Sequence, residues 1–239
     1  MDATLVKVTD VKKRATADEL ELYAYVSDKA EEVVDEITDL VKVGMKTGDG
    51  GLLFIYGPVY SGKTLAACLL VDRLETKDLN VAAIQPEVGR PDVPTDKYFS
   101  RSGLEKKVES VSNKQEILKI FDKHDIVIID EVQFFHSDIQ SFLLKVISDF
   151  VERGGWVIAL GMLYTSQRSE FLISAVLKDR SFKNFGLTAT CLKCGKNGSI
   201  YNQRTVNGLP TSADDPELIA PSATVAYEPR CIDCHVIIG

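Results

Sequence analysis

Four short, mainly apolar runs alternate along the chain with longer stretches in which apolar and polar residues recur at helical spacing. The runs cover residues 52–56, 81–85, 126–130 and 156–160. Continuous apolar strands joined by helix-length connections are typical of a parallel sheet that helices cover on both faces. Ligands bind such sheets at the carboxyl ends of the strands. We therefore expect an α/β core over residues 49–188, with a functional site at that edge.

Residues 1–48 differ from this core because they are highly charged, contain no proline and end in a glycine-rich linker. Within them, apolar residues recur three or four positions apart, at Tyr23, Val26, Ala30, Val33, Ile37 and Leu40. This spacing predicts an amphipathic helix with one apolar seam. We interpret residues 1–48 as a helical extension whose seam packs on the chain's own core. A coiled-coil contact between subunits stays open, although the repeat is short for one.

A phosphate-loop motif directly follows the first apolar run. Residues 57–64 read Gly-Pro-Val-Tyr-Ser-Gly-Lys-Thr, which fits the pattern G-x-x-x-x-G-K-[ST]. The glycines let backbone N–H groups turn toward the phosphates, Lys63 reaches the β and γ oxygens, and the Thr64 hydroxyl contacts Mg²⁺. The sequence therefore predicts ATP and Mg²⁺ as ligands, held by Gly57, Ser61, Gly62, Lys63 and Thr64.

Two adjacent acidic residues stand at the end of the third apolar run. Asp130 ends the run and Glu131 comes next, at a distance from the phosphate loop that allows an intervening helix, strand and helix. Asp130 fits the acid that orders Mg²⁺ in phosphate-loop proteins. Glu131 is placed to take a proton from an attacking hydroxyl. The pair predicts phosphoryl transfer, with Glu131 and Lys63 as catalytic residues.

Four cysteines near the end of the chain have the spacing of a metal site. They form two C-x-x-C pairs, Cys191 with Cys194 and Cys231 with Cys234. Four thiolates in this arrangement suit a closed, structural Zn²⁺ site. We expect residues 189–239 to form a small zinc-binding domain whose intervening loop can act as a lid. His235 is a possible substitute ligand, whereas Cys68 is expected to be a buried apolar residue.

The overall charge argues against several other functions. The chain has 239 residues, 35 of them acidic and 28 basic, for a net charge of -7. Binding to nucleic acid requires a basic surface, so we expect no nucleic-acid partner and disfavour a nucleic-acid-dependent ATPase. The sequence also contains no apolar run long enough to span a bilayer. We therefore expect no membrane partner and a cytoplasmic location.

These motifs, in this order, resemble the thymidine kinase family of the cellular and bacterial type. The resemblance covers residues 51–239 and is most detailed in the cysteine-bearing part, where residues 227–235 read Tyr-Glu-Pro-Arg-Cys-Ile-Asp-Cys-His. The other matching blocks are residues 61–64, 85–86 with Arg90 and 100–103, 130–135, 165–168 with Phe171, 191–195, and 201–204. Residues 1–48 lie outside the resemblance.

The resemblance implies a RecA-like core, a zinc domain with a substrate-covering lasso loop, and transfer of phosphate from ATP to the 5′-hydroxyl of a pyrimidine deoxynucleoside. Glu131 would be the general base, and Arg90 would lie near the transferred group. The family is commonly tetrameric, which implies a homo-oligomer. The positions implied to contact the nucleoside are Phe134, Arg168, Phe171, Asn202, Ser222 and Tyr227.

The chain departs from the family pattern mainly around the nucleoside. An acid and an aromatic residue of the family's base pocket are replaced by Leu163 and Ser166, and the acid before the arginine is Gly89. The lasso pair is Pro221 and Ser222, and proline removes a backbone donor. Two interpretations follow. The protein is a kinase with an altered pyrimidine acceptor, thymidine or deoxyuridine by default, or it is a nucleotide-binding regulatory or interaction protein on the same scaffold.

Overall fold

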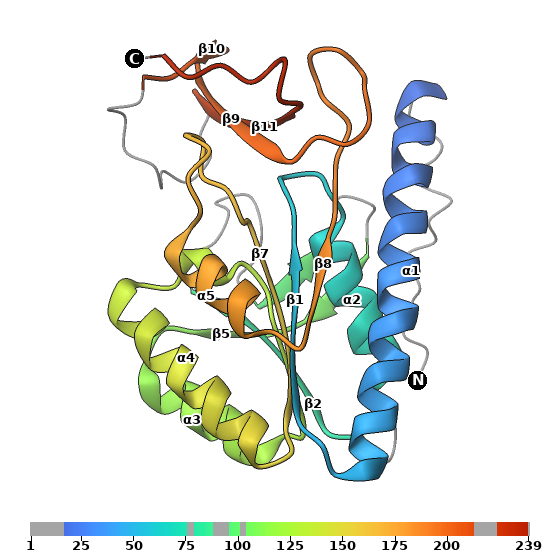
Figure 1. Cartoon of the computed structure of the whole chain (residues 1–239), viewed down its shortest axis with the longest axis vertical. Helices are drawn as coiled ribbons and strands as arrows, with labels where there is room; N and C mark the ends of the chain where they lie inside the picture. Colours follow the sequence, from blue (N-terminus) through green and yellow to red (C-terminus); the bar gives the residue numbers. More distant parts are fainter. Residues whose placement is uncertain (1–16, 76–78, 88–95, 101–103, 213–223, 239) are drawn as a thin grey trace.

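A six-stranded sheet forms the centre of the protein (Figure 1). The structure, a computed structural model, describes residues 17–75, 79–87, 96–100, 104–212 and 224–238. All strand pairs of the sheet are parallel, in the order β5-β2-β6-β7-β1-β8. The strands are β1 (Gly51–Tyr56), β2 (Val81–Pro86), β5 (Glu109–Val111), β6 (Ile126–Ile129), β7 (Trp156–Gly161) and β8 (Lys183–Gly186). The four predicted strands are thus the four inner strands, and the predicted parallel sheet is confirmed.

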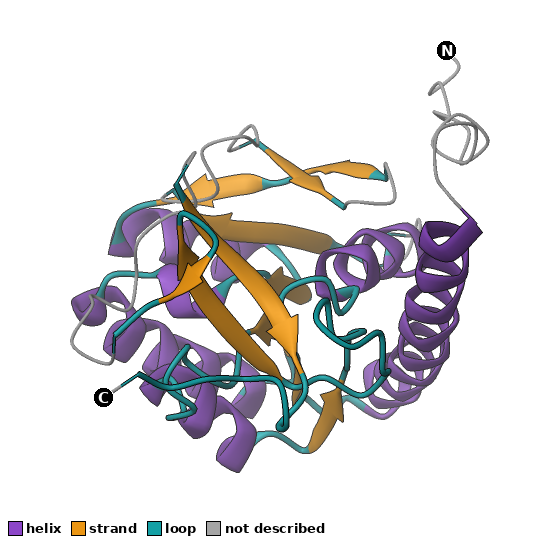
Figure 2. Ribbon diagram, turned by 90° about the horizontal axis from the view of Figure 1, so that it is seen from above, coloured by secondary structure: helices purple, strands orange, loops and turns teal. Residues whose placement is uncertain are grey.

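Helices cover both faces of this sheet (Figure 2). One face packs against α1 (Ala17–Thr47) and α2 (Lys63–Leu74), and the other against α3 (Lys114–Lys123), α4 (Ser137–Glu152) and α5 (Leu172–Arg180). Successive residues of a strand point to opposite faces. Accordingly Leu53 and Ile55 lie in the first apolar cluster, whereas Leu52 and Phe54 lie in the second.

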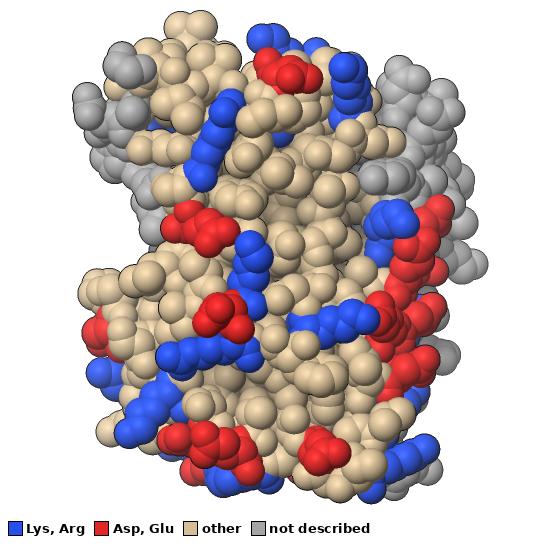
Figure 3. Space-filling view, viewed as in Figure 1, with Lys and Arg blue, Asp and Glu red and all other residues tan. Residues whose placement is uncertain are grey.

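The helix α1 packs along the core as one long element. Its fully buried apolar residues are Ala30, Val34, Ile37 and Val41. The predicted seam was therefore correct at Ala30 and Ile37, but Val33 and Leu40 are only partly buried beside it. Ion pairs join Asp35 to Arg73 of α2 and Glu36 to Lys183 of β8, and acidic side chains gather along the outward side of α1 (Figure 3). The interpretation that the helix packs on its own core is confirmed.

The cysteine-bearing part contains a small antiparallel sheet of β9 (Tyr201–Val206), β10 (Leu209–Pro210) and β11 (Val225–Arg230). It lies at the end of the main sheet where the phosphate loop follows β1 (Figure 1). A further hairpin consists of β3 (Lys97–Phe99) and β4 (Glu105–Lys107). Among the helices that the structure describes, none has the length and apolar character that a membrane span requires.

Candidate active site

The phosphate loop connects β1 to α2 in a conformation that requires glycine at two places. Gly62 has φ 89°, a left-handed conformation that favours glycine. At Gly57, a Cβ atom would lie 2.5 Å from the carbonyl oxygen of Leu187 and 2.6 Å from the hydroxyl of Ser61. The strand, loop and helix therefore adopt the arrangement that the motif predicted.

Two side chains inside the loop are suited to phosphate oxygens. Lys63 is 6% exposed, and its Nζ donates hydrogen bonds to the carbonyl oxygens of Gly57 at 3.0 Å and Pro58 at 2.8 Å. Among the described residues, the buried hydroxyl of Ser61 has no hydrogen-bond partner. A buried polar group without a partner is costly, and a phosphate oxygen beside it would satisfy it. The loop therefore fits a nucleoside triphosphate.

Asp130 follows β6 and lies next to the start of α2. Its Oδ2 accepts a hydrogen bond from the Thr64 hydroxyl at 2.9 Å, and its Oδ1 accepts one from the backbone N–H of Glu131 at 2.8 Å. Burial, together with the neighbouring charge of Glu131, raises the pKa of Asp130 to about 7. A divalent cation beside this carboxylate would favour its ionised form. Thr64 and Asp130 are thus the pair suited to hold Mg²⁺.

Glu131 is held in place by a neighbour whose role the sequence did not reveal. Glu131 has φ 54°, and its Oε2 accepts a hydrogen bond from Nε2 of Gln133 at 2.5 Å. Oε1 of the same Gln133 amide accepts a hydrogen bond from the backbone N–H of Met162 at 3.0 Å. Because Gln133 is 1% exposed, it has little freedom to turn. We therefore assign Gln133 as a positioning residue that orients the Glu131 carboxylate.

Asn202, predicted to contact the nucleoside, forms hydrogen bonds within the protein. It is 2% exposed, and its Oδ1 accepts a hydrogen bond from the backbone N–H of Val59 in the phosphate loop at 2.8 Å. Its Nδ2 faces the sulfur of Met162 at 3.3 Å and the carbonyl oxygen of Tyr164 at 3.4 Å. Asn202 therefore joins β9 to the phosphate loop and to the chain that follows β7.

Replacing Asn202 by alanine is expected to weaken ATP binding about 5- to 150-fold, because the partly buried N–H of Val59 would lose its acceptor at a cost of about 1–3 kcal/mol. The free energy of unfolding should fall by the same order. Calorimetric titration with Mg-ATP and urea unfolding measure the two effects. The matched control is Asn184→Ala, which removes an exposed amide bonded to the carbonyl oxygen of Lys178. Wild-type ATP affinity in Asn202→Ala would contradict this role.

Arg168, also predicted to contact the nucleoside, lies against the second cysteine pair. Its Nε donates to Nδ1 of His235 at 3.2 Å, and its Nη2 donates to the carbonyl oxygen of His235 at 2.9 Å. Since Nδ1 accepts, the proton of the neutral ring lies on Nε2, which donates to the carbonyl oxygen of Asn202 at 3.2 Å. Burial, followed by the charge of Arg168, lowers the pKa of His235. His235 thus uses both ring nitrogens within the protein.

The other predicted nucleoside contacts divide into two groups. Phe134, Phe171 and Tyr227 are half-buried and lie after β6, before α5 and on β11. Arg90 and Ser222 lie outside the described residues. The substituted position Leu163 is 2% exposed, so an apolar side chain occupies the place where the family resemblance implies an acid.

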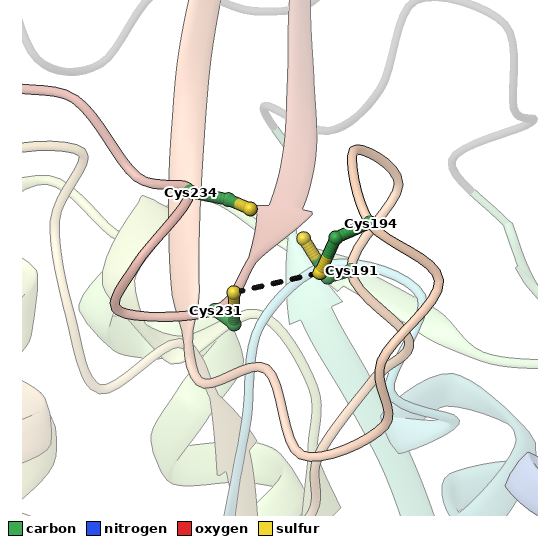
Figure 4. Close-up of side chains that lie close together, drawn as sticks. All are labelled: Cys191, Cys194, Cys231 and Cys234. Carbon is green, nitrogen blue, oxygen red and sulfur yellow. Dashed lines mark hydrogen bonds between the residues drawn. The ribbon is translucent and has the colours of Figure 1, made fainter.

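The four cysteines come together as a compact cluster (Figure 4). Their sulfur atoms all lie within 4.8 Å of one another, and Sγ of Cys194 is 3.7 Å from Sγ of Cys231. Tetrahedral Zn²⁺ with Zn–S bonds of about 2.3 Å places its sulfurs about 3.8 Å apart. Cys191 is buried, which raises its pKa, but backbone N–H groups of Cys231, Lys193 and Cys194 more than offset this and bring it to about 6. The cluster therefore fits a structural Zn²⁺ site.

Several solved structures resemble the chain at low similarity. They are a Pif1 helicase from Candida albicans (14% identity, TM-score 0.39, covering 67% of this chain and 38% of the helicase), domain III of the Thermotoga maritima replication initiation protein DnaA (18%, 0.40, 64% and 61%), and a variant of RuvB from Thermotoga maritima (17%, 0.40, 65% and 44%). The chain thus spans between 38% and 61% of the length of these proteins.

A match to a protein family covers most of the chain. The family described as thymidine kinase matches residues 50–235, which include the phosphate loop, the acidic pair after β6 and all four cysteines. The matched residues thus include Lys63, Thr64 and Asp130, whose geometry fits a nucleoside triphosphate with Mg²⁺. The extension that contains α1 lies outside the match. The chain belongs to the thymidine kinase family.

Proposed function

We propose that this protein transfers the γ-phosphoryl group of ATP to the 5′-hydroxyl of a pyrimidine deoxynucleoside. The observation that carries the proposal is the arrangement at the carboxyl edge of the sheet. Lys63 and the Thr64–Asp130 pair lie at the phosphate loop, and Glu131, held by Gln133, follows Asp130 directly. A phosphate site beside an oriented carboxylate is what activation of a hydroxyl for phosphoryl transfer requires.

In the proposed reaction, the 5′-oxygen forms a bond to the γ-phosphorus while the bond from that phosphorus to the β–γ bridging oxygen breaks. Glu131 accepts the proton of the hydroxyl, and ADP leaves with the electron pair of the broken bond. Lys63 donates hydrogen bonds to the phosphate oxygens as negative charge develops on them. Mg²⁺, when bound by Thr64 and Asp130, neutralises charge on the phosphates. Arg90 lies outside the described residues, and we propose that it contacts the transferred group.

We propose thymidine, deoxyuridine or a 5-substituted deoxyuridine as the acceptor. The half-buried rings of Phe134, Phe171 and Tyr227 supply apolar surface of the kind that encloses a base. Leu163 and Ser166 replace an acid and an aromatic residue of the family pattern, so the pocket is expected to select among pyrimidines differently from its relatives. We further propose that the active form is a homo-oligomer, as is common in the family.

A panel of nucleosides tests the proposal. ADP production from Mg-ATP is measured with thymidine, deoxyuridine, deoxycytidine and 5-substituted deoxyuridines, and Lys63→Ala serves as the blank. We expect ADP release that depends on one pyrimidine deoxynucleoside and falls at least about 100-fold in Lys63→Ala, since that side chain would bind the γ-phosphate directly. ADP release that is the same with and without every nucleoside would contradict the proposal.

The replacements at Leu163 and Ser166 favour one alternative, a nucleotide-binding regulatory or interaction protein. Under that alternative, the phosphate loop binds ATP but the chain has no acceptor nucleoside. Measured ATP affinity combined with no nucleoside-dependent ADP release would support it. Site residues, rather than the fold, decide between the two functions.

A further inference from the structure

The helix α1, which lies outside the family match, contacts the phosphate loop. Its residues Val26 and Ala30 face Gly62, the residue directly before Lys63. A Cβ atom on Gly62 would lie 2.7 Å from Cγ1 of Val26, 3.4 Å from the carbonyl oxygen of Val26 and 3.6 Å from Cβ of Ala30. The helix therefore approaches the loop so closely that only glycine leaves room for it.

Gly62 is a position at which small movements matter for nucleotide binding. It is the N-cap residue of α2, and its carbonyl oxygen accepts the hydrogen bond from the N–H of Ala66 at 2.8 Å. The backbone N–H groups that follow it are the ones a phosphate loop directs at its ligand. A contact that fixes Gly62 therefore fixes the start of the helix whose first N–H groups bind phosphate.

The helix α1 is anchored well enough to support the loop. Ala30, Val34, Ile37 and Val41 are fully buried, and ion pairs join α1 to α2 and β8. Beyond its far end, the Trp156 indole N–H donates to the carbonyl oxygen of Asp49 at 2.7 Å. The contact of Val26 with Gly62 is thus made by an element held along much of its length.

We propose that α1 is a positioning element of the nucleotide site, in which Val26 holds Gly62 in its left-handed conformation and so keeps the phosphate loop ready to bind. Because coupling between two sites is reciprocal, bound nucleotide in turn holds the part of α1 around Val26 and Ala30 against the loop. The inference uses the nucleotide site of the proposed function but does not depend on which nucleoside is accepted. It gives the added N-terminal segment a role in binding ATP.

The test compares Val26→Lys with Val43→Lys, which places the same charge on the same helix at a residue that is 62% exposed. Calorimetric titration with Mg-ATP, without nucleoside, is expected to show a dissociation constant about 5- to 50-fold higher for Val26→Lys and unchanged for Val43→Lys. In the kinase assay the KM for ATP should rise while kcat changes less than about twofold. Fluorescence of Trp156, the single tryptophan of the chain, reports whether the core stays packed.

Equal ATP affinity in wild type and Val26→Lys would overturn the inference, as would a loss of affinity accompanied by a changed Trp156 spectrum, which indicates general unfolding. Hydrogen exchange of the wild type supplies the reciprocal measurement. Amides of residues 26–33 should exchange more slowly with Mg-ATP than without it, and unchanged rates would contradict the coupling. Absence of ATP binding by the wild type would instead overturn the proposed function, so the two failures are distinguishable.

Discussion

Replacing Glu131 by glutamine is expected to lower kcat for phosphoryl transfer by about 10²–10⁴-fold. The amide keeps the size of the carboxylate but cannot take the proton of the 5′-hydroxyl. ATP binding should stay within about twofold of wild type, because Lys63, Thr64 and Asp130, the residues proposed to hold Mg-ATP, are unchanged. Steady-state kinetics with the preferred nucleoside and calorimetric titration with Mg-ATP measure the two quantities.

The control for this experiment is Glu170→Gln, which makes the same chemical change at an exposed glutamate paired with Lys178. It should leave kcat unchanged. If Glu131→Gln turned over at the wild-type rate, another group would have to be the base. A large loss of ATP affinity in Glu131→Gln would instead mean that this carboxylate acts mainly through the metal and triphosphate.

Removal of Zn²⁺ is expected to have the largest effect on stability. Structural Zn²⁺ sites contribute apparent binding free energies of about 10–16 kcal/mol at neutral pH, which is comparable to the whole stability of a domain. Cys231→Ser should therefore lose the bound metal and the order of β9 to β11. Nucleoside phosphorylation should be lost with it, because Asn202 connects β9 to the phosphate loop.

Metal analysis and hydrogen exchange of β9 and β11 measure these effects. The matched control is Cys68→Ala, which alters the one cysteine outside the cluster, a buried residue of α2 whose pKa burial raises to about 12. It should retain one Zn²⁺ per chain. A Cys231→Ser protein that kept its metal and its protection from exchange would contradict the assignment of the four-cysteine site.

The inner part of the fold could be predicted because burial leaves a clear pattern. The strands β1, β2, β6 and β7 lie inside the sheet, and each was visible as an apolar run. The edge strands β5 and β8 were missed because an edge strand is half-exposed and accepts polar side chains. Glu109 of β5 and Lys183 and Asn184 of β8 are exposed, so these segments contain no apolar run that would mark a strand.

The register of α1 was predicted only in part, because helical spacing of three or four allows more than one seam. Val33 and Leu40 fit the spacing as well as Val34 and Val41 do, and packing on α2 and the sheet selected the second pair. The contact with Gly62 could not be found from spacing at all, since it joins residues that are distant in the sequence.

The placement of the candidate site residues was predictable where a motif fixes both residue type and position, as at Lys63, Thr64, Asp130 and the four cysteines. The supporting residues were not. The only sequence feature that points to Gln133 is its position two residues after Glu131. Arg168, Asn202 and His235 form a hydrogen-bond network that links three separate segments. Side chains of this kind are assigned only when the fold brings them together.

The most direct test of the central claim is transfer of the terminal phosphate from γ-labelled Mg-ATP to a pyrimidine deoxynucleoside, with the labelled product separated and identified. The account predicts label in a nucleoside 5′-monophosphate with the wild type, and little or none with Lys63→Ala or Glu131→Gln. Label that appears only as inorganic phosphate, or stays in ATP with every nucleoside while ATP still binds, would contradict it.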